Sequence, residues 1–162
     1  MSKYTWFRDS VPKELPVKQV YGIVFSIDGR VILRKETGKY KLTGGTPENI
    51  ETFEETLKRE YIEELNIELE DIFYLGYLEV NDNAEKYAQV RMIAKIKNIH
   101  DCRPDPATGM IYERELVHVD KIALYLNYPD DAGNKMIVDA IEMARKMGLF
   151  AEKQDKQFWE KV

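Results

Sequence analysis

The chain has 162 residues, of which 44% are hydrophobic and 33% charged, and its formal net charge is −5. This size and composition are typical of one soluble globular domain with a real core, and the negative charge argues against nucleic acid or anionic membranes as partners. Cys102 is the only cysteine, which excludes an intrachain disulfide and fits a reducing compartment.

The N-terminal segment, residues 1–16, contains Trp6 and Phe7 and then two prolines. We expect it to form an arm or a short edge strand. Its first residues lack the apolar run of a signal peptide, and no apolar stretch of the chain reaches the length of a membrane span. We therefore expect a cytoplasmic protein in which residues 1–162 form a single domain.

Three strands are predicted before the first helix. Residues 17–27 are rich in β-branched and aromatic side chains, and Asp28-Gly29 is a tight hairpin signal before a second strand at 30–34. Residues 40–43 should form a short strand that leads into Gly44-Gly45.

A helix rich in carboxylates is predicted after this double glycine. Thr52 is a suitable N-cap, and Glu55, three residues later, completes a capping box. An apolar residue recurs every fourth position, which draws one apolar stripe along the helix: Phe53, Leu57, Tyr61 and Leu65.

Three acids of this helix form a cluster beside the stripe. Glu64 falls inside it and Glu60 on its border, with Glu63 next to Glu60, because residues three and four apart are neighbours on a helix. Crowded carboxylates beside a core need a cation, and all-oxygen ligands favour Mg²⁺ or Mn²⁺. The alternative is a solvated acidic face in which Glu64 pairs with a nearby Arg or Lys.

Further strands are predicted at 71–80 and 86–97. In the second of these, the residues that alternate toward the core are Ala88, Val90, Met92, Ala94 and Ile96. The other side offers Tyr87, Gln89 and Arg91, which together suit a base, a sugar and phosphates. The alternative for this side is an ordinary solvated sheet face.

The remaining chain is predicted as loop, strand and helix. Residues 100–109 form a loop, 111–119 a last strand and 121–126 a short helical turn, and a helix over 131–147 ends at Gly148. The tail, 150–162, is charged but contains Phe158-Trp159, which could dock on the domain or on a second subunit. Helices separated by strands indicate an α/β fold with both faces of the sheet covered.

The acidic helix carries a motif of specific spacing. Gly45 is followed after five residues by Glu51, and after seven more by the run REYIEELNI at positions 59–67. This resembles the Nudix box of the MutT-like Nudix hydrolases, which reads Gly, five residues, Glu, seven residues, Arg-Glu-aliphatic-any-Glu-Glu-any-Gly-aliphatic. Tyr61 replaces an aliphatic residue and Asn66 replaces the glycine that ends the helix, but every carboxylate of the motif is present.

The resemblance implies an α/β/α sandwich with a mixed, curved sheet between helices. It also implies that Mg²⁺ or Mn²⁺ is bound by Glu60, Glu63 and Glu64 and by the backbone carbonyl of Gly45. Arg59, with Glu51 nearby, would brace the catalytic acids.

The general base stays open at this point. Glu63 or Glu64 could serve, and many relatives use a glutamate from a loop after the box. The candidates of that kind are Glu113 and Glu115. The alternative interpretation is that these two glutamates are ordinary surface charges on the last strand.

The resemblance implies metal-dependent hydrolysis of a diphosphate linkage in a nucleoside diphosphate joined to another group. The expected substrate contacts are Gly44, Tyr87, Gln89 and Arg91, and the protein would act on a small nucleotide as a monomer or homodimer. The alternative is a silent Nudix-like domain that only senses nucleotides, although such domains have usually lost box carboxylates.

Overall fold

The protein is described by a computed structural model, in which residues 1–151 are placed; the Phe158-Trp159 pair lies outside these described residues. The strands are β1 (Lys3–Phe7), β2 (Val17–Phe25), β3 (Arg30–Glu36), β4 (Lys39–Lys41), β5 (Thr43–Gly45), β6 (Ile67–Asn81), β7 (Lys86–Ile99) and β8 (Glu113–His118). The helices are α1 (Phe53–Leu65), α2 (Ile122–Leu126) and α3 (Asp131–Lys146).

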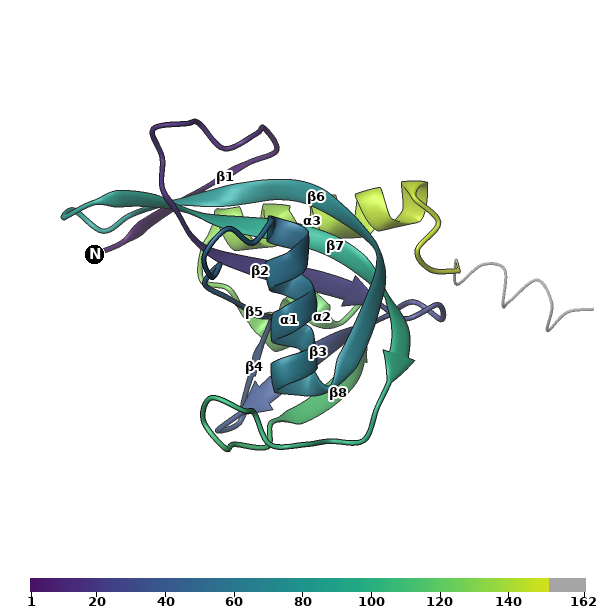
Figure 1. The fold of residues 1–162 in the computed structure, drawn as a ribbon. Helices are drawn as coiled ribbons and strands as arrows, with labels where there is room; N and C mark the ends of the chain where they lie inside the picture. Colours follow the sequence, from purple (N-terminus) through teal and green to yellow (C-terminus); the bar gives the residue numbers. More distant parts are fainter. Residues whose placement is uncertain (152–162) are drawn as a thin grey trace, which may run out of the picture.

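The strands form one mixed sheet in the order β1-β6-β7-β2-β3-β4, with β5 paired to β2 and β8 paired to β3. The β2–β7 pair is parallel, and the other pairs are antiparallel. In Figure 1, α1 lies in front of the sheet and α3 behind it. The predicted α/β/α sandwich with a mixed sheet is therefore confirmed, and β1 makes residues 3–7 the expected edge strand.

Two apolar cores form, one on each face of the sheet. On the α1 side, Leu57, Tyr61 and Leu65 pack against Val20 and Val90. On the other side, α2 and α3 pack against a second set of strand residues, including Ile23, Leu33 and Ile93. Because neighbouring strand residues point to opposite faces, each central strand contributes to both cores.

Two details differ from the predicted elements. The strand expected at 40–43 is split into β4 and β5, because β4 pairs with β3 whereas β5 pairs with β2. The last helix buries Met136, Ala140 and Ala144 as expected, but Met147 is 43% exposed because it lies at the C-cap, where the chain leaves the core. None of the helices in the described chain is long and apolar enough to cross a lipid bilayer.

Candidate active site

Local sequence signals set the ends of α1. The Thr52 hydroxyl accepts a hydrogen bond from the Glu55 backbone N–H at 3.1 Å, and the Glu55 carboxylate accepts one from the Thr52 N–H at 3.0 Å. Asn66 ends the helix in the left-handed conformation, with φ of 56°. The buried Tyr61 hydroxyl donates to the Gly22 carbonyl at 3.0 Å. These contacts fix how far α1 is rotated on the sheet and so where its carboxylates lie.

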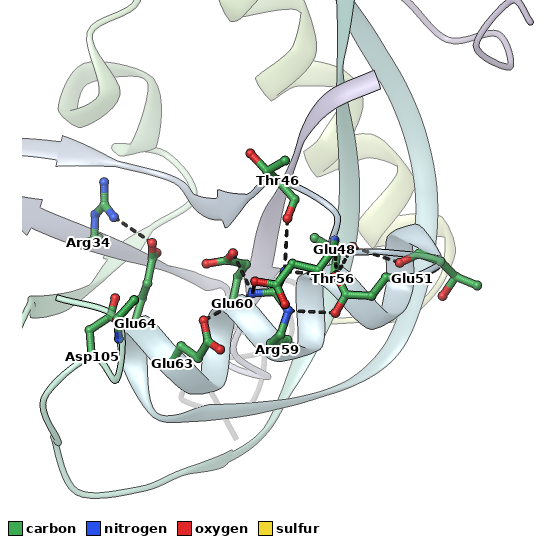
Figure 2. Close-up of polar contacts among 12 residues, drawn as sticks. Arg34, Thr46, Glu48, Glu51, Thr56, Arg59, Glu60, Glu63, Glu64 and Asp105 are labelled. Carbon is green, nitrogen blue, oxygen red and sulfur yellow. Dashed lines mark hydrogen bonds and ion pairs between the residues drawn. The ribbon is translucent and has the colours of Figure 1, made fainter. Parts of the chain in front are cut away.

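Arg59 is the centre of the polar network in Figure 2. Its guanidinium makes two parallel bonds to the Glu51 carboxylate, at 2.7 and 3.0 Å. It also donates to Glu60 at 2.9 Å, to Glu63 at 3.3 Å and to the Thr46 carbonyl at 3.1 Å. The pKa of Glu51 is lowered to about 2, and the main cause is its hydrogen bonding to Arg59. Arg59 therefore ties the loop before the helix to two acids of the cluster.

Glu60 lies against the backbone of Gly45. A Cβ atom at position 45 would meet the carboxylate carbon of Glu60 at 2.4 Å, so only glycine leaves room for this contact. Burial raises the pKa of Glu60, and the nearby Glu63 and Asp105 carboxylates add to that effect, while Arg59 opposes it. The motif glycine thus has a steric role at the acid cluster.

Glu64 is the most buried acid of the helix and faces the sheet. Its Oε1 pairs with Arg34 of β3 at 3.1 Å; its Oε2 is buried without a cationic partner within the described residues, and the buried Thr43 hydroxyl lies next to the carboxylate. Burial raises the pKa of Glu64 to about 7; Glu60 and Asp105 raise it further and Arg34 lowers it. The pairing of Glu64 with an arginine was one of the two alternatives from the sequence, and Arg34 is that partner.

Asp105 is a site residue that the sequence reasoning missed. It is buried, comes from the loop between β7 and β8, and lies close to Glu64 and Glu63 in Figure 2. The Ala107 N–H donates to its carboxylate at 2.8 Å, and its own N–H donates to the Met110 carbonyl at 2.7 Å. A usable signal was present, because an aspartate between Pro104 and Pro106 sits on a restricted backbone.

The donor set suits a hard divalent cation. Glu60, Glu63, Glu64 and Asp105 supply only oxygen atoms, and the buried Glu64 Oε2, which has no cationic partner in the described chain, is an acceptor of the kind that an ion satisfies. As the side chains stand within residues 1–151, no three acids converge on one point, because Arg59 holds Glu60 and Glu63 while Arg34 holds Glu64. A bound cation would neutralise the carboxylate charge that Arg34 and Arg59 now neutralise.

Glu113 and Glu115 are not brought to this cluster. Glu115 is paired with Leu33 across β3 and β8, so it shares the sheet face of α2 and α3, and it accepts a hydrogen bond from the Tyr40 hydroxyl at 3.2 Å. Glu113, two residues away, lies on the same face. Arg114, between them, points to the α1 side and donates to the Leu65 carbonyl at 2.6 Å. The strand register, which the sequence did not reveal, puts both glutamates on the face opposite α1.

A cavity of about 890 Å³ lies on the sheet face of α2 and α3, between β2, β4, β7 and the segment from the end of α2 to Pro129. Of the expected substrate contacts, Gln89 and Arg91 line it, and so does Arg34, which connects it to Glu64. Gly44 instead pairs with Tyr21 in the sheet, where a Cβ atom would lie 2.0 Å from the Val20 carbonyl.

Tyr87 is the other expected contact that does not line the cavity. Its ring lies under the Lys18 ammonium, which is 4.4 Å from the ring centre. The structure therefore brings together two of the four expected substrate contacts, Gln89 and Arg91, and adds Arg34 to them.

Several solved structures share the fold. They include the pyrophosphohydrolase RppH of Bacillus subtilis, at 19% identity and a TM-score of 0.69, with 88% of this chain and 92% of that chain covered. The mutator MutT protein of Bacillus halodurans has 21% identity and a TM-score of 0.53, with 74% and 78% covered. The MutT Nudix hydrolase of Burkholderia pseudomallei has 23% identity and a TM-score of 0.52, with 78% and 98% covered.

No curated protein matches the chain in sequence. The NUDIX domain family, however, matches residues 16–134, which is more than half of the chain and contains the whole box helix, Arg34 and Asp105. The chain therefore belongs to the Nudix hydrolase family.

Proposed function

We propose that this protein hydrolyses a diphosphate linkage in a small nucleotide, with Mg²⁺ or Mn²⁺ held by the acids of α1. The observation that carries the proposal is the position of Glu64, which is buried beside Glu60 and Asp105 and whose Oε2 has no cationic partner among the described residues. A helix that served only as scaffold would gain nothing from burying acids together.

The chain's own residues would bind and orient the reacting groups. Glu60, Glu63 and Glu64 and the Gly45 carbonyl would hold the cation, and Arg59 keeps two of these acids in place. When bound, the cation lowers the pKa of a coordinated water and neutralises phosphate charge. Arg34 lies between the cavity and Glu64, where it can bind a phosphate oxygen of the substrate.

The fold bears on which residue could act as the general base. Glu113 and Glu115 lie on the sheet face of α2 and α3, away from the acids of α1, but Glu115 accepts a hydrogen bond from Tyr40, which lines the cavity. Glu63, Glu64, Glu115 and the loop residue Asp105 are candidates for the general base, and Asp105 comes from a loop after the box.

The experiment is a measurement of phosphate and pyrophosphate release from a panel of nucleotides with Mg²⁺ or Mn²⁺. We expect turnover of one class of nucleotide by the unmodified protein and loss of it in Glu64→Gln. Glu54→Gln is the matched control, because Glu54 is an exposed acid of the same helix that pairs only with Lys58. Equal turnover by the Glu64 and Glu54 variants would refute the proposal.

A further inference from the structure

The cavity beside the acid cluster is strongly basic, in a protein of net charge −5. Its lining includes four cationic side chains: Arg34, Lys39, Lys41 and Arg91. No aspartate or glutamate is present among the described residues that line it. Arg34 and Lys41 are both close to Glu36, at 3.2 and 3.8 Å. Among the described residues neither Lys39 nor Arg91 has a carboxylate partner, and Lys39 is exposed, so Arg91 is the buried unpaired cation of the cavity.

Arg91 is a buried cation with weak internal bonding. Only 5% of its surface is exposed, and its Nε has no hydrogen-bond partner in residues 1–151. Its other polar contacts are with uncharged groups: the Tyr128 side chain, the Val90 carbonyl at 3.5 Å from Nη1 and the Gln89 side chain at 3.4 Å from Nη2. No carboxylate of the described chain pairs with it, yet a guanidinium stays charged in proteins. Burying an unpaired charge is costly, so this position calls for an anion.

Two tyrosine side chains, Tyr21 and Tyr128, contact the Arg91 guanidinium. The guanidinium lies 4.8 Å from the centre of the Tyr21 ring, and the Tyr128 side chain is beside it. Tyr128 is held by the start of α3, where a Cβ atom at Gly133 would lie 2.5 Å from the ring. A glycine in the first turn of a helix is therefore what lets Tyr128 reach this position.

The strand pairing shows how far Arg91 lies from the acids of α1. Arg91 pairs with Tyr21 across β7 and β2, and Tyr21 pairs with Gly44 across β2 and β5. Two strand spacings, about 10 Å, separate the backbone of Arg91 from that of Gly44. The Arg91 side chain shares the sheet face of α2 and α3 with Tyr21, whereas Glu60 lies on the α1 side, so the two side chains are farther apart than this spacing. A group bound at Arg91 would thus be a separate part of the same substrate molecule, not the linkage under attack.

We propose that Arg91 binds a second phosphate group of the substrate, a phosphomonoester outside the diphosphate linkage that faces the α1 acids. This inference rests on the proposed function for the identity of that linkage. The substrate class is then a diphosphate-linked nucleotide that carries an additional phosphate. A nucleobase edge would supply acceptors but no charge, whereas a phosphate supplies both and can satisfy the free Nε.

The test compares pairs of compounds that differ by one phosphate. NAD⁺ and NADP⁺ differ by a 2′-phosphate, and dephospho-coenzyme A and coenzyme A by a 3′-phosphate. Binding is measured by isothermal titration calorimetry with EDTA present, so that it is independent of hydrolysis. In at least one pair, we expect the phosphorylated member to bind at least about tenfold more tightly.

Variants assign this gain to Arg91. We expect Arg91→Gln to abolish most of the gain and Arg91→Lys, which keeps the charge but not the planar fork, to retain part of it. Arg30→Gln is the matched control, because it also removes one guanidinium but lies at the exposed hairpin, paired with Asp28. If Arg91→Gln does not fold, as judged by circular dichroism, the reduced gain in Arg91→Lys and the gain in the unmodified protein decide the question.

Three outcomes would overturn the inference. They are an absence of gain in both pairs, a gain that Arg91→Gln leaves unchanged, and Arg91-dependent binding of inorganic phosphate alone without a gain in either pair. Loss of all hydrolysis, with the Arg91-dependent gain retained, would instead contradict the proposed function while supporting an anion site at Arg91.

Discussion

Gly45 lies directly against the carboxylate of Glu60: a Cβ atom at position 45 would stand 2.2 Å from Glu60 Oε1. The backbone of Gly45 is not in the left-handed region, so the requirement for glycine here is purely steric. The double glycine of the sequence consequently has two separate causes. Gly44 permits the close pairing of β5 with β2, and Gly45 permits Glu60 to approach the backbone.

The substitution Gly45→Ala should displace the Glu60 carboxylate while leaving the strand pairing intact. Because small misplacements of reacting groups are costly, we expect a loss of about 10–100-fold in kcat/KM and weaker Mn²⁺ binding. Steady-state kinetics and Mn²⁺ titration check this. Gly148→Asn is the control, since a Cβ atom at Gly148 meets nothing within 4 Å, asparagine tolerates its φ of 70°, and Gly148 does not line the cavity. Unchanged Mn²⁺ affinity in Gly45→Ala would show that the contact has no role.

Arg59→Lys should lower both activity and stability, although lysine keeps the positive charge. A lysine cannot make two parallel bonds to Glu51 and at the same time contact Glu60, Glu63 and the Thr46 carbonyl. We expect kcat to fall by about tenfold or more and the free energy of unfolding to fall by about 1–3 kcal/mol. The neighbouring Lys58→Gln should change neither quantity, since Lys58 is exposed. If Arg59→Lys raises KM and leaves kcat unchanged, Arg59 contributes to substrate binding and not to positioning the acids.

Glu51 should make stability depend on acid pH. Its pKa falls from 4.5 to about 2 in the folded protein, chiefly through the bonds to Arg59, with help from the Glu48 N–H and the Thr56 hydroxyl. A folded pKa below the unfolded one stabilises the protein above about pH 4.5, and that contribution is lost as the pH falls toward 2.

The measurement is urea unfolding of the unmodified protein and of Glu51→Gln from pH 6 to pH 2.5. The difference in unfolding free energy between the two should shrink as the pH falls through this window. Glu54→Gln, which removes an exposed acid, supplies the baseline. A difference that stays constant across the range would mean that Arg59 does not stabilise ionised Glu51.

Saturating Mg²⁺ should raise the melting temperature of the unmodified protein through the acids of α1. At a concentration of 100 times the Kd, linkage gives about 2.7 kcal/mol. For a protein of this size, that corresponds to a shift of about 5–10 °C. Glu64→Gln should lose most of the shift, because Oε2 is a buried acceptor without a cationic partner in residues 1–151, while Glu54→Gln should keep it. Equal shifts in all three proteins would contradict cation binding at this helix.

The end of α1 offers a test of stability alone. Asn66 has φ of 56°, and its side chain donates to the Arg103 carbonyl at 3.3 Å. Asn66→Ala should lower the free energy of unfolding by about 1 kcal/mol, because alanine pays the left-handed penalty without a compensating bond. Asn66→Gly should come out more stable than Asn66→Ala. An alanine variant as stable as the unmodified protein would show that the helix end relaxes.

The local parts of the site could be predicted from the sequence. The capping box at Thr52, the asparagine cap and the apolar stripe are interactions within a few residues, so the start, the end and the buried face of α1 follow from the sequence itself. The spacing of Gly45, Glu51 and the 59–67 run identified the family for the same reason, since it is a property of one continuous segment.

The partners that complete the site depended on the tertiary structure. The sequence left open whether a cation or a neighbouring Arg or Lys would neutralise Glu64, and it could not name the basic residue, which is Arg34, thirty positions away on β3. The register of β8 on β3 decides that Arg114 faces α1 while Glu113 and Glu115 do not, and a shift of one residue would reverse this. The two prolines beside Asp105 mark a restricted loop, but which elements Asp105 and Tyr128 contact depends on the course of their loops in the folded protein. Residue spacing within one continuous segment thus determined the Nudix motif, whereas strand register and loop path, set by packing across the whole sheet, decided which residues face it.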